Sequence, residues 1–74
     1  MDQLLEILRD IRHEINWENE TALIDDGVLD SFDMITLVNE LNSAFRVQIG
    51  LEHLEPENFN SVGAMEALIE ALKL

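Results

Sequence analysis

Apolar residues recur every three or four positions along most of this 74-residue chain, which is the spacing of one face of an α-helix. The spacing predicts three substantial helices, over about residues 3–15, over about residues 31–46 and from residue 62 onward. A one-turn helix is expected over about residues 56–60, because proline is tolerated at the first helical position. The three apolar stripes consist of Leu4, Leu8, Ile11 and Ile15, then Met34, Ile35, Val38, Leu41 and Phe45, then Val62, Met65, Leu68, Ile69 and Leu72.

The segments between these helices are expected to be loops. Apolar residues alternate with polar ones over 47–54, as in a strand, but the chain offers no second strand to pair with. Residues 16–27 lack a sustained stripe and predict a long loop, with Leu23 and Ile24 turned inward and Gly27 in a turn. The expected fold is all-α, a small four-helix bundle of three main helices and one short helix, with a long loop after the first.

Length and composition limit the chemistry that this fold can support. At 74 residues the chain has room for one domain with a small core, spanning residues 1–74. It contains no cysteine, which excludes thiolate catalysis, cysteine-based zinc sites and disulfides and is compatible with a reducing cytoplasm. The first residues carry charges every few positions, unlike a signal peptide or a membrane span. We therefore expect a monomeric cytoplasmic domain that does not insert into membranes.

The acidity of the chain bears on its partners. Sixteen acidic residues against four basic ones give a formal net charge of -12. Such a charge repels phosphates, so nucleic acid is not expected as a partner, whereas basic protein surfaces are. Self-repulsion should also destabilise the fold, most strongly at low salt.

The densest polar motif is DDGVLDSFD, residues 25–33, directly before the second main helix. A calcium-binding EF-hand loop needs alternating ligands with glycine at the sixth position, a template that this motif does not match. Loose binding of divalent cations by its aspartates is expected, but no dedicated metal site. Ser31 lacks a G-x-S-x-G elbow, and both histidines lie far from it in the sequence, so it is not expected to act as a nucleophile by itself.

The helix start suggests a passive role for the same serine. Asp30 is expected to be the N-cap, and Asp33, three residues later, to complete a capping box. Ser31 then occupies the first helical position with its hydroxyl toward solvent. A phosphate attached there would lie near the positive end of the helix dipole, although the two aspartates would partly cancel that attraction. From these residues alone, Ser31 is either a modification site or an ordinary first-turn residue.

This arrangement resembles the acyl carrier protein family over nearly the whole chain. The shared features are an opening helix, a long loop ending in D-x-G-x-x-D-S at Asp25–Ser31, a second helix closing with Phe45, and PENFNSV at Pro56–Val62 before a last amphipathic helix. The resemblance implies that a dedicated transferase, using magnesium, moves 4′-phosphopantetheine from coenzyme A onto Ser31. The thiol of that arm would then hold an acyl or aminoacyl group as a thioester. The chain would be a carrier and not an enzyme.

The resemblance also implies partners and contact residues. The partners would be a phosphopantetheinyl transferase, a ligase that loads the acyl or aminoacyl group, and the acyltransferases or synthases that receive it. Asp30 and Asp33 match family acids that help to dock the transferase. The full set of implied docking residues is Asp30, Phe32, Asp33, Met34 and Glu40. The alternative is a non-carrier acidic helical module that binds a basic protein and whose serine is unmodified or phosphorylated.

Two departures from fatty-acid carriers favour a specialised member of the family. Phe32 stands where those carriers usually have leucine or methionine. Their second helix also exposes several glutamates, whereas the corresponding face here consists of Thr36, Asn39, Glu40, Asn42 and Ser43, with Arg46 at its end. Recognition should then rely more on hydrogen bonds and apolar contacts than on charge. This favours a carrier for an adenylating ligase or a D-alanyl-type transfer system, with fatty-acid or polyketide synthesis as the alternative.

Some members of the family shelter the acyl chain between their helices. By resemblance, the lining here would consist of Val38, Leu41, Ile49, Leu54, Phe59, Ala64 and Leu68. An ordinary closed core is the alternative interpretation of the same residues. Trp17, just after the first helix, is expected to pack at the end of the bundle.

Overall fold

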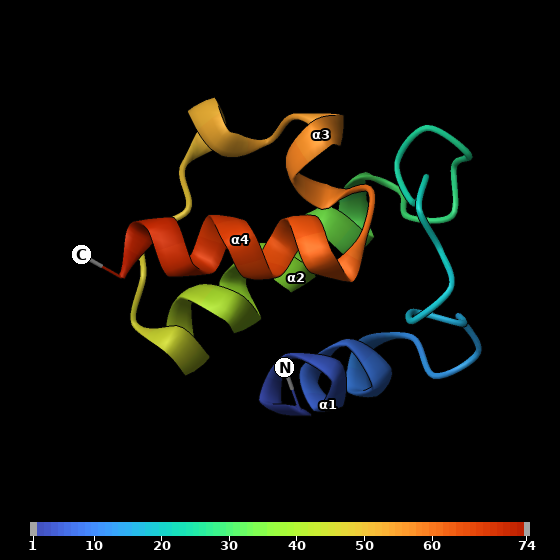
Figure 1. Ribbon diagram of the computed structural model, residues 1–74, viewed down its shortest axis with the longest axis horizontal. Helices are drawn as coiled ribbons and strands as arrows, with labels where there is room; N and C mark the ends of the chain where they lie inside the picture. The colour runs from blue at the N-terminus through green and yellow to red at the C-terminus, as the bar shows by residue number, and fades with distance from the viewer. Residues whose placement is uncertain (1, 74) are drawn as a thin grey trace.

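The computed structural model describes residues 2–73, which contain four α-helices and one 3₁₀ turn but no strand. These elements are α1 (Asp2–Ile11), α2 (Ser31–Phe45), η1 (Leu51–His53), α3 (Pro56–Phe59) and α4 (Val62–Leu72). Helix α1 packs against α2 and α4, and α3 packs against α4. The long loop after α1 forms one end of the molecule (Figure 1). The predicted all-α fold and the ordered loop over 47–54 are confirmed.

Helix α1 ends at Ile11, earlier than the predicted end near residue 15. The N–H of Arg12 still donates to the carbonyl of Leu8 at 3.0 Å, but the indole Nε1 of Trp17 then donates to the carbonyl of Arg12 at 3.0 Å. That bond satisfies one of the carbonyls that a helix end leaves without an intrahelical partner. Trp17 is only 2% exposed, so the chain turns back at this point and packs the indole against the end of α1. Its predicted packing role is confirmed, whereas Ile15 lies outside the helix.

The long loop between α1 and α2 is held by buried residues of its own. Leu23 is fully buried and Leu29 nearly so, and the N–H of Leu29 donates to the carbonyl of Leu23 at 3.1 Å. Asn60, which follows α3, fixes the same loop from outside, since its side-chain Oδ1 accepts the N–H of Ile24 at 3.0 Å. Gly27 has a φ of 72°, a backbone conformation that favours glycine. The inward placement of Leu23 and the turn at Gly27 are therefore as predicted.

Helix α2 turns most of its predicted apolar stripe to the core: Leu41 is buried, and Met34, Val38 and Phe45 pack against the core, but Ile35 does not. Leu37 is also buried, whereas Ile35 is 61% exposed. Residues two positions apart in an α-helix lie about 200° apart around its axis, so Ile35 and Leu37 cannot share a face. The prediction of Ile35 as a core residue is wrong, and Leu37 takes its place.

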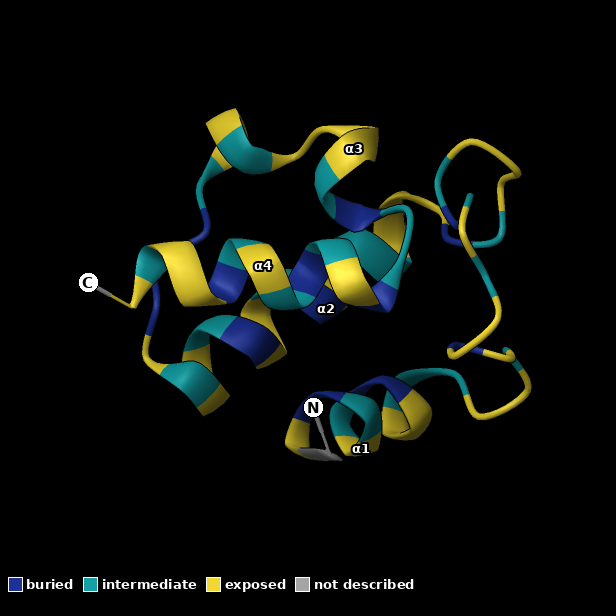
Figure 2. Ribbon diagram, in the orientation of Figure 1, coloured by how far each residue is buried: buried dark blue, intermediate teal, exposed yellow. Residues whose placement is uncertain are grey.

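The last two helices begin as predicted. Pro56 is the first residue of α3, and the side chain of Ser61 caps α4 by accepting the N–H of Ala64 at 3.1 Å. Figure 2 shows buried positions on all four helices and in the segments between them. The core consists of Leu4, Leu8, Trp17, Leu23, Leu29, Leu37, Leu41, Val47, Ile49, Phe59, Val62, Met65 and Ile69. Over residues 2–73, no helix is long and apolar enough to cross a membrane.

Candidate functional site

Ser31 is the first residue of α2 and is exposed to solvent. Asp30 precedes it as the N-cap, and the Oδ1 of Asp30 accepts the N–H of Asp33 at 2.8 Å. In return, the Oδ2 of Asp33 accepts the N–H of Asp30 at 3.2 Å. The predicted capping box is therefore present. It fixes the backbone on both sides of Ser31 while leaving that residue at the surface.

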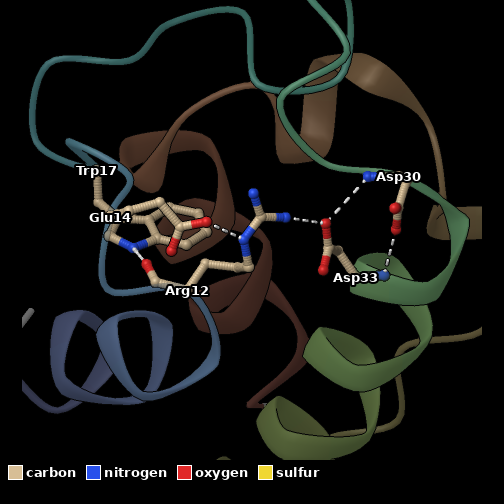
Figure 3. Close-up of polar contacts among 5 residues, drawn as sticks. All are labelled: Arg12, Glu14, Trp17, Asp30 and Asp33. Atoms are coloured by element: carbon tan, nitrogen blue, oxygen red, sulfur yellow. Dashed lines mark hydrogen bonds and ion pairs between the residues drawn. The ribbon is translucent and has the colours of Figure 1, made fainter.

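Arg12, whose role was not predicted from the sequence, lies beside this capping box. The Nη1 of Arg12 lies 2.6 Å from the Oδ2 of Asp33, and its Nε donates to a carboxylate oxygen of Glu14 (Figure 3). The hydrogen bond to Glu14, together with the charges of Asp33 and Glu14, raises the pKa of Arg12. The same hydrogen bond lowers the pKa of Glu14. Arg12 is one of only four basic residues, but nothing in its sequence spacing indicates Asp33 as its partner.

The predicted docking residues differ in how accessible they are. Phe32 is 81% exposed, and Asp30 and Glu40 are also exposed. Met34 is half-buried. Asp33 is half-buried as well, and its carboxylate already binds the guanidinium described above and the N-cap amide. The docking roles of these five residues stay predictions.

An apolar groove of about 550 Å³ opens beside Ser31. Helix α2 forms one wall, and the segment from residue 49 to residue 56 forms the other. The lining residues are Ile24, Ser31, Met34, Ile35, Val38, Asn39, Ile49, Gly50, Leu51, Leu54, Glu55 and Pro56. Ser31 is both exposed and part of this lining, so it lies where the groove meets solvent.

The groove contains three of the seven residues predicted to line an acyl pocket, namely Val38, Ile49 and Leu54. The other four lie elsewhere: Leu41 and Phe59 are fully buried in the core, and Ala64 and Leu68 belong to α4. The reason is that the space is lined by α2, Ile24 and the segment 49–56, and by no residue of α4. Apolar side chains that the prediction omitted, including Leu51 at 87% exposure, complete the groove. That the groove holds an acyl chain stays a prediction.

Hydrogen bonds fix the wall opposite α2. The Oδ1 of Asn42 accepts the N–H of Ile49 at 2.8 Å, and its Nδ2 donates to the carbonyl of Ile49 at 3.4 Å. The N–H of Gly50 donates to Nδ1 of His53 at 3.1 Å. Asn42 was expected on the face that partners contact, but it is half-buried and its amide is used within the fold. That expectation is corrected because the Asn42 amide satisfies backbone groups of a half-buried loop.

Within residues 2–73, the acidic side chains do not form a metal site. No group of three acidic or histidine side chains within that range is arranged to hold a metal ion.

At the rim of the groove, a hydrogen bond with Glu57 and the charge of that residue raise the pKa of Glu55. Such a shift is typical of two carboxyl groups close together.

Fold and site together define a small helical domain that presents an exposed serine at a helix start, next to an apolar groove. The chain is 34% identical over 56 residues to the probable acyl carrier protein PigG of Serratia sp. (strain ATCC 39006). The alignment covers 76% of this chain and 64% of that relative's length. No protein-family model matches the chain, and no solved structure gives a significant match. This similarity supports the resemblance of the chain to the acyl carrier protein family, and the chain spans slightly less than two thirds of that relative's length.

Proposed function

We propose that this chain is a carrier that holds an acyl or aminoacyl group as a thioester on a 4′-phosphopantetheine arm attached to Ser31, and delivers it to partner enzymes. The observation that carries the proposal is the position of Ser31 at the exposed first turn of α2, between the two capping-box aspartates. An exposed hydroxyl on a fixed helix start can enter the active site of another protein. The relative described as a probable acyl carrier protein supports the carrier class.

The chain's own residues would present the arm and accommodate part of its load. The arm, when bound, supplies a thiol, which this cysteine-free sequence lacks. The capping box holds Ser31 outward, and the groove beside it offers apolar surface to the arm or to an apolar cargo. Tethering raises the effective concentration of the cargo at each successive active site. In this role the chain carries the reacting group and is not itself the enzyme.

The exposed face of α2 supports a specialised pathway over central fatty-acid synthesis. Its exposed residues Thr36, Asn39 and Ser43 are uncharged, and Phe32 and Ile35 add apolar surface. We propose that the transferase, the loading ligase and the receiving acyltransferase or synthase contact this face mainly through hydrogen bonds and apolar contacts. The net charge of -12 disfavours nucleic acid as a partner. A monomer in the cytoplasm, loaded by an adenylating ligase or a D-alanyl-type system, fits this proposal.

Intact mass measurement tests the carrier function. The unmodified protein is incubated with coenzyme A, magnesium and a broad-specificity phosphopantetheinyl transferase. The expected result is the mass gain of one phosphopantetheine in the wild type and in Thr21→Ala, and none in Ser31→Ala. Thr21 is the matched control because it is an exposed hydroxyl residue of the loop, outside the face of α2 that is proposed to contact partners. No gain in the wild type, with a transferase that modifies a second carrier in parallel, would favour the non-carrier module.

A further inference from the structure

We infer that Arg12 is a positioning residue for the modification of Ser31, because its guanidinium holds the capping-box aspartate at the start of α2. The inference rests on the proposed function, in which Ser31 is the attachment site. It concerns a residue in the turn after α1, which lies outside the motif that surrounds the serine. Figure 3 shows the guanidinium of Arg12 reaching across to Asp33.

The ion pair between Arg12 and Asp33 is partly shielded from water. The Nη1 of Arg12 lies 2.6 Å from the Oδ2 of Asp33, and the side chains are 34% and 15% exposed, respectively. By comparison, the ion pair between Arg9 and Glu18 has side chains that are 52% and 62% exposed. Shielding strengthens the attraction between charges, whereas exposed pairs contribute little. The pair of Arg12 is therefore the one suited to hold a fixed geometry.

The main chain of Arg12 is itself anchored. Its N–H donates to the carbonyl of Leu8, and its carbonyl accepts the Nε1 of the buried Trp17. Its Nε also donates to Glu14, so the guanidinium is held from two sides. Arg12 is thus a fixed support and not a mobile surface side chain.

The contacts continue from Arg12 to both sides of the serine. The Oδ2 of Asp33 accepts from Arg12 and from the N–H of Asp30, while the N–H of Asp33 donates to Asp30. Ser31 lies between these two aspartates in the sequence. Among residues 2–73, no other ion pair joins the first third of the chain to α2. Loss of the guanidinium is therefore expected to loosen the backbone around Ser31.

If Asp33 helps to position the helix start, removal of Arg12 has the opposite effect from the one expected if Asp33 only docks the transferase. If the carboxylate served mainly to attract the transferase, removal of Arg12 would free its charge and leave modification unchanged or faster. If Arg12 positions the helix start, its removal slows modification. Neutralising Asp33 then gives the same loss, and combining both changes adds little.

The experiment measures transfer of phosphopantetheine from coenzyme A over a range of carrier concentrations, followed by intact mass. The variants are Arg12→Gln, Arg12→Lys, Asp33→Asn and the double variant Arg12→Gln/Asp33→Asn, with Arg9→Gln as the matched control. We expect kcat to fall roughly tenfold in Arg12→Gln and in Asp33→Asn, because a small misplacement of a reacting group is costly. The double variant should fall no further, Arg12→Lys should lie between wild type and Arg12→Gln, and Arg9→Gln should match wild type. KM for the carrier should stay within about twofold, since positioning acts after binding.

Amide hydrogen exchange gives a readout that needs no transferase. The N–H groups of Asp30 and Asp33 should exchange several-fold faster in Arg12→Gln than in Arg9→Gln, because they depend on the same contacts. Unchanged exchange, unchanged or faster transfer in Arg12→Gln, or additive losses in the double variant would each overturn the inference. If Arg12→Gln does not fold, the comparison of Arg12→Lys with wild type decides by the same criteria. A wild type that is folded but not modified would count against the proposed function instead, while the exchange result would still judge the role of Arg12.

Discussion

The side chain of Asp33 connects the turn after α1 with the start of α2, where Ser31 is the first residue. Its Oδ2 accepts both the guanidinium of Arg12 and the N–H of Asp30. Any substitution of Asp33 therefore changes the helix cap and the link to the end of α1 together. A slower reaction in an Asp33 variant would not by itself identify a contact with a partner enzyme.

Two glutamates should respond to pH in opposite directions. The pKa of Glu55 is raised above its ordinary value of 4.5 by Glu57, so its contribution to stability is present below that value and is lost as pH rises through the raised pKa. We expect Glu55→Gln to raise Tm at pH 7 and to have no effect near pH 4, where the wild-type side chain is protonated. Thermal unfolding followed by circular dichroism at both pH values measures this difference. An equal gain in Tm at both values would contradict it.

Glu14 is the matched comparison for that experiment. Its pKa is lowered by the hydrogen bond from Arg12, so its contribution is present above the ordinary value and is lost as pH falls through the lowered pKa. We expect Glu14→Gln to lower Tm at pH 7, and the difference from wild type to shrink in acid. A loss of stability that persists in acid would show that Glu14 acts by packing and not by its charge.

At the scale of the element, the start of α2 depends on the cap at Asp30. The side chain of Asp30 accepts the N–H of Asp33, and asparagine caps helices about as well as aspartate. We expect Asp30→Ala to lower the free energy of unfolding by about 1 kcal/mol, and Asp30→Asn to stay close to wild type. Urea denaturation measures both. An equal loss in the two variants would show that the charge, and not the cap, stabilises the helix start.

The helices themselves were largely predictable from the sequence, but their ends and faces were less so. Each apolar stripe sets a helical period, which is a local property of the chain. Where α1 ends depends on a buried indole that satisfies the carbonyl of Arg12. Which residues of α2 are buried depends on the helices that pack against it, and this packing buries Leu37 and leaves Ile35 exposed.

In the candidate site too, features set by residues close in sequence were predictable, whereas features set by tertiary packing were not. The capping box around Ser31 was predictable because its members lie within four positions of one another. The pairing of Arg12 with Asp33 depends on how the long loop folds back, and the spacing of the two residues in the sequence does not reveal it. The groove was misplaced in part for a related reason, since it opens between α2 and a loop and not between two helices.

At the scale of the whole molecule, most of the positive charge is neutralised internally. Arg9 pairs with Glu18, Arg12 with Glu14 and Asp33, and Lys73 with Glu70 (ion pairs at 4 Å or less). Arg46 is exposed at the end of α2. The described surface is therefore dominated by acids, whereas the exposed face of α2 carries few charges, chiefly Glu40 and Arg46. In the proposed function, long-range attraction to a basic partner and close contact with α2 would thus depend on different parts of the surface.

The excess of acids also makes the fold sensitive to salt. Because the formal net charge is -12, repulsion among like charges opposes the compact state and is screened by added ions. We expect Tm to rise when sodium chloride is added, and to rise at least as much with magnesium chloride at the same ionic strength. Calorimetry at low protein concentration measures both. A flat or falling Tm would mean that ion pairs such as that of Arg12 outweigh the repulsion.

The buried indole at the end of α1 makes the protein its own optical reporter. Trp17 is the sole tryptophan in the sequence, and its Nε1 is bonded to the backbone of the arginine that supports the helix start. Its fluorescence therefore comes from a single environment, coupled to the segment that carries Ser31. Emission spectra can follow loosening of that segment in real time, without a label attached to the surface proposed for partner contact.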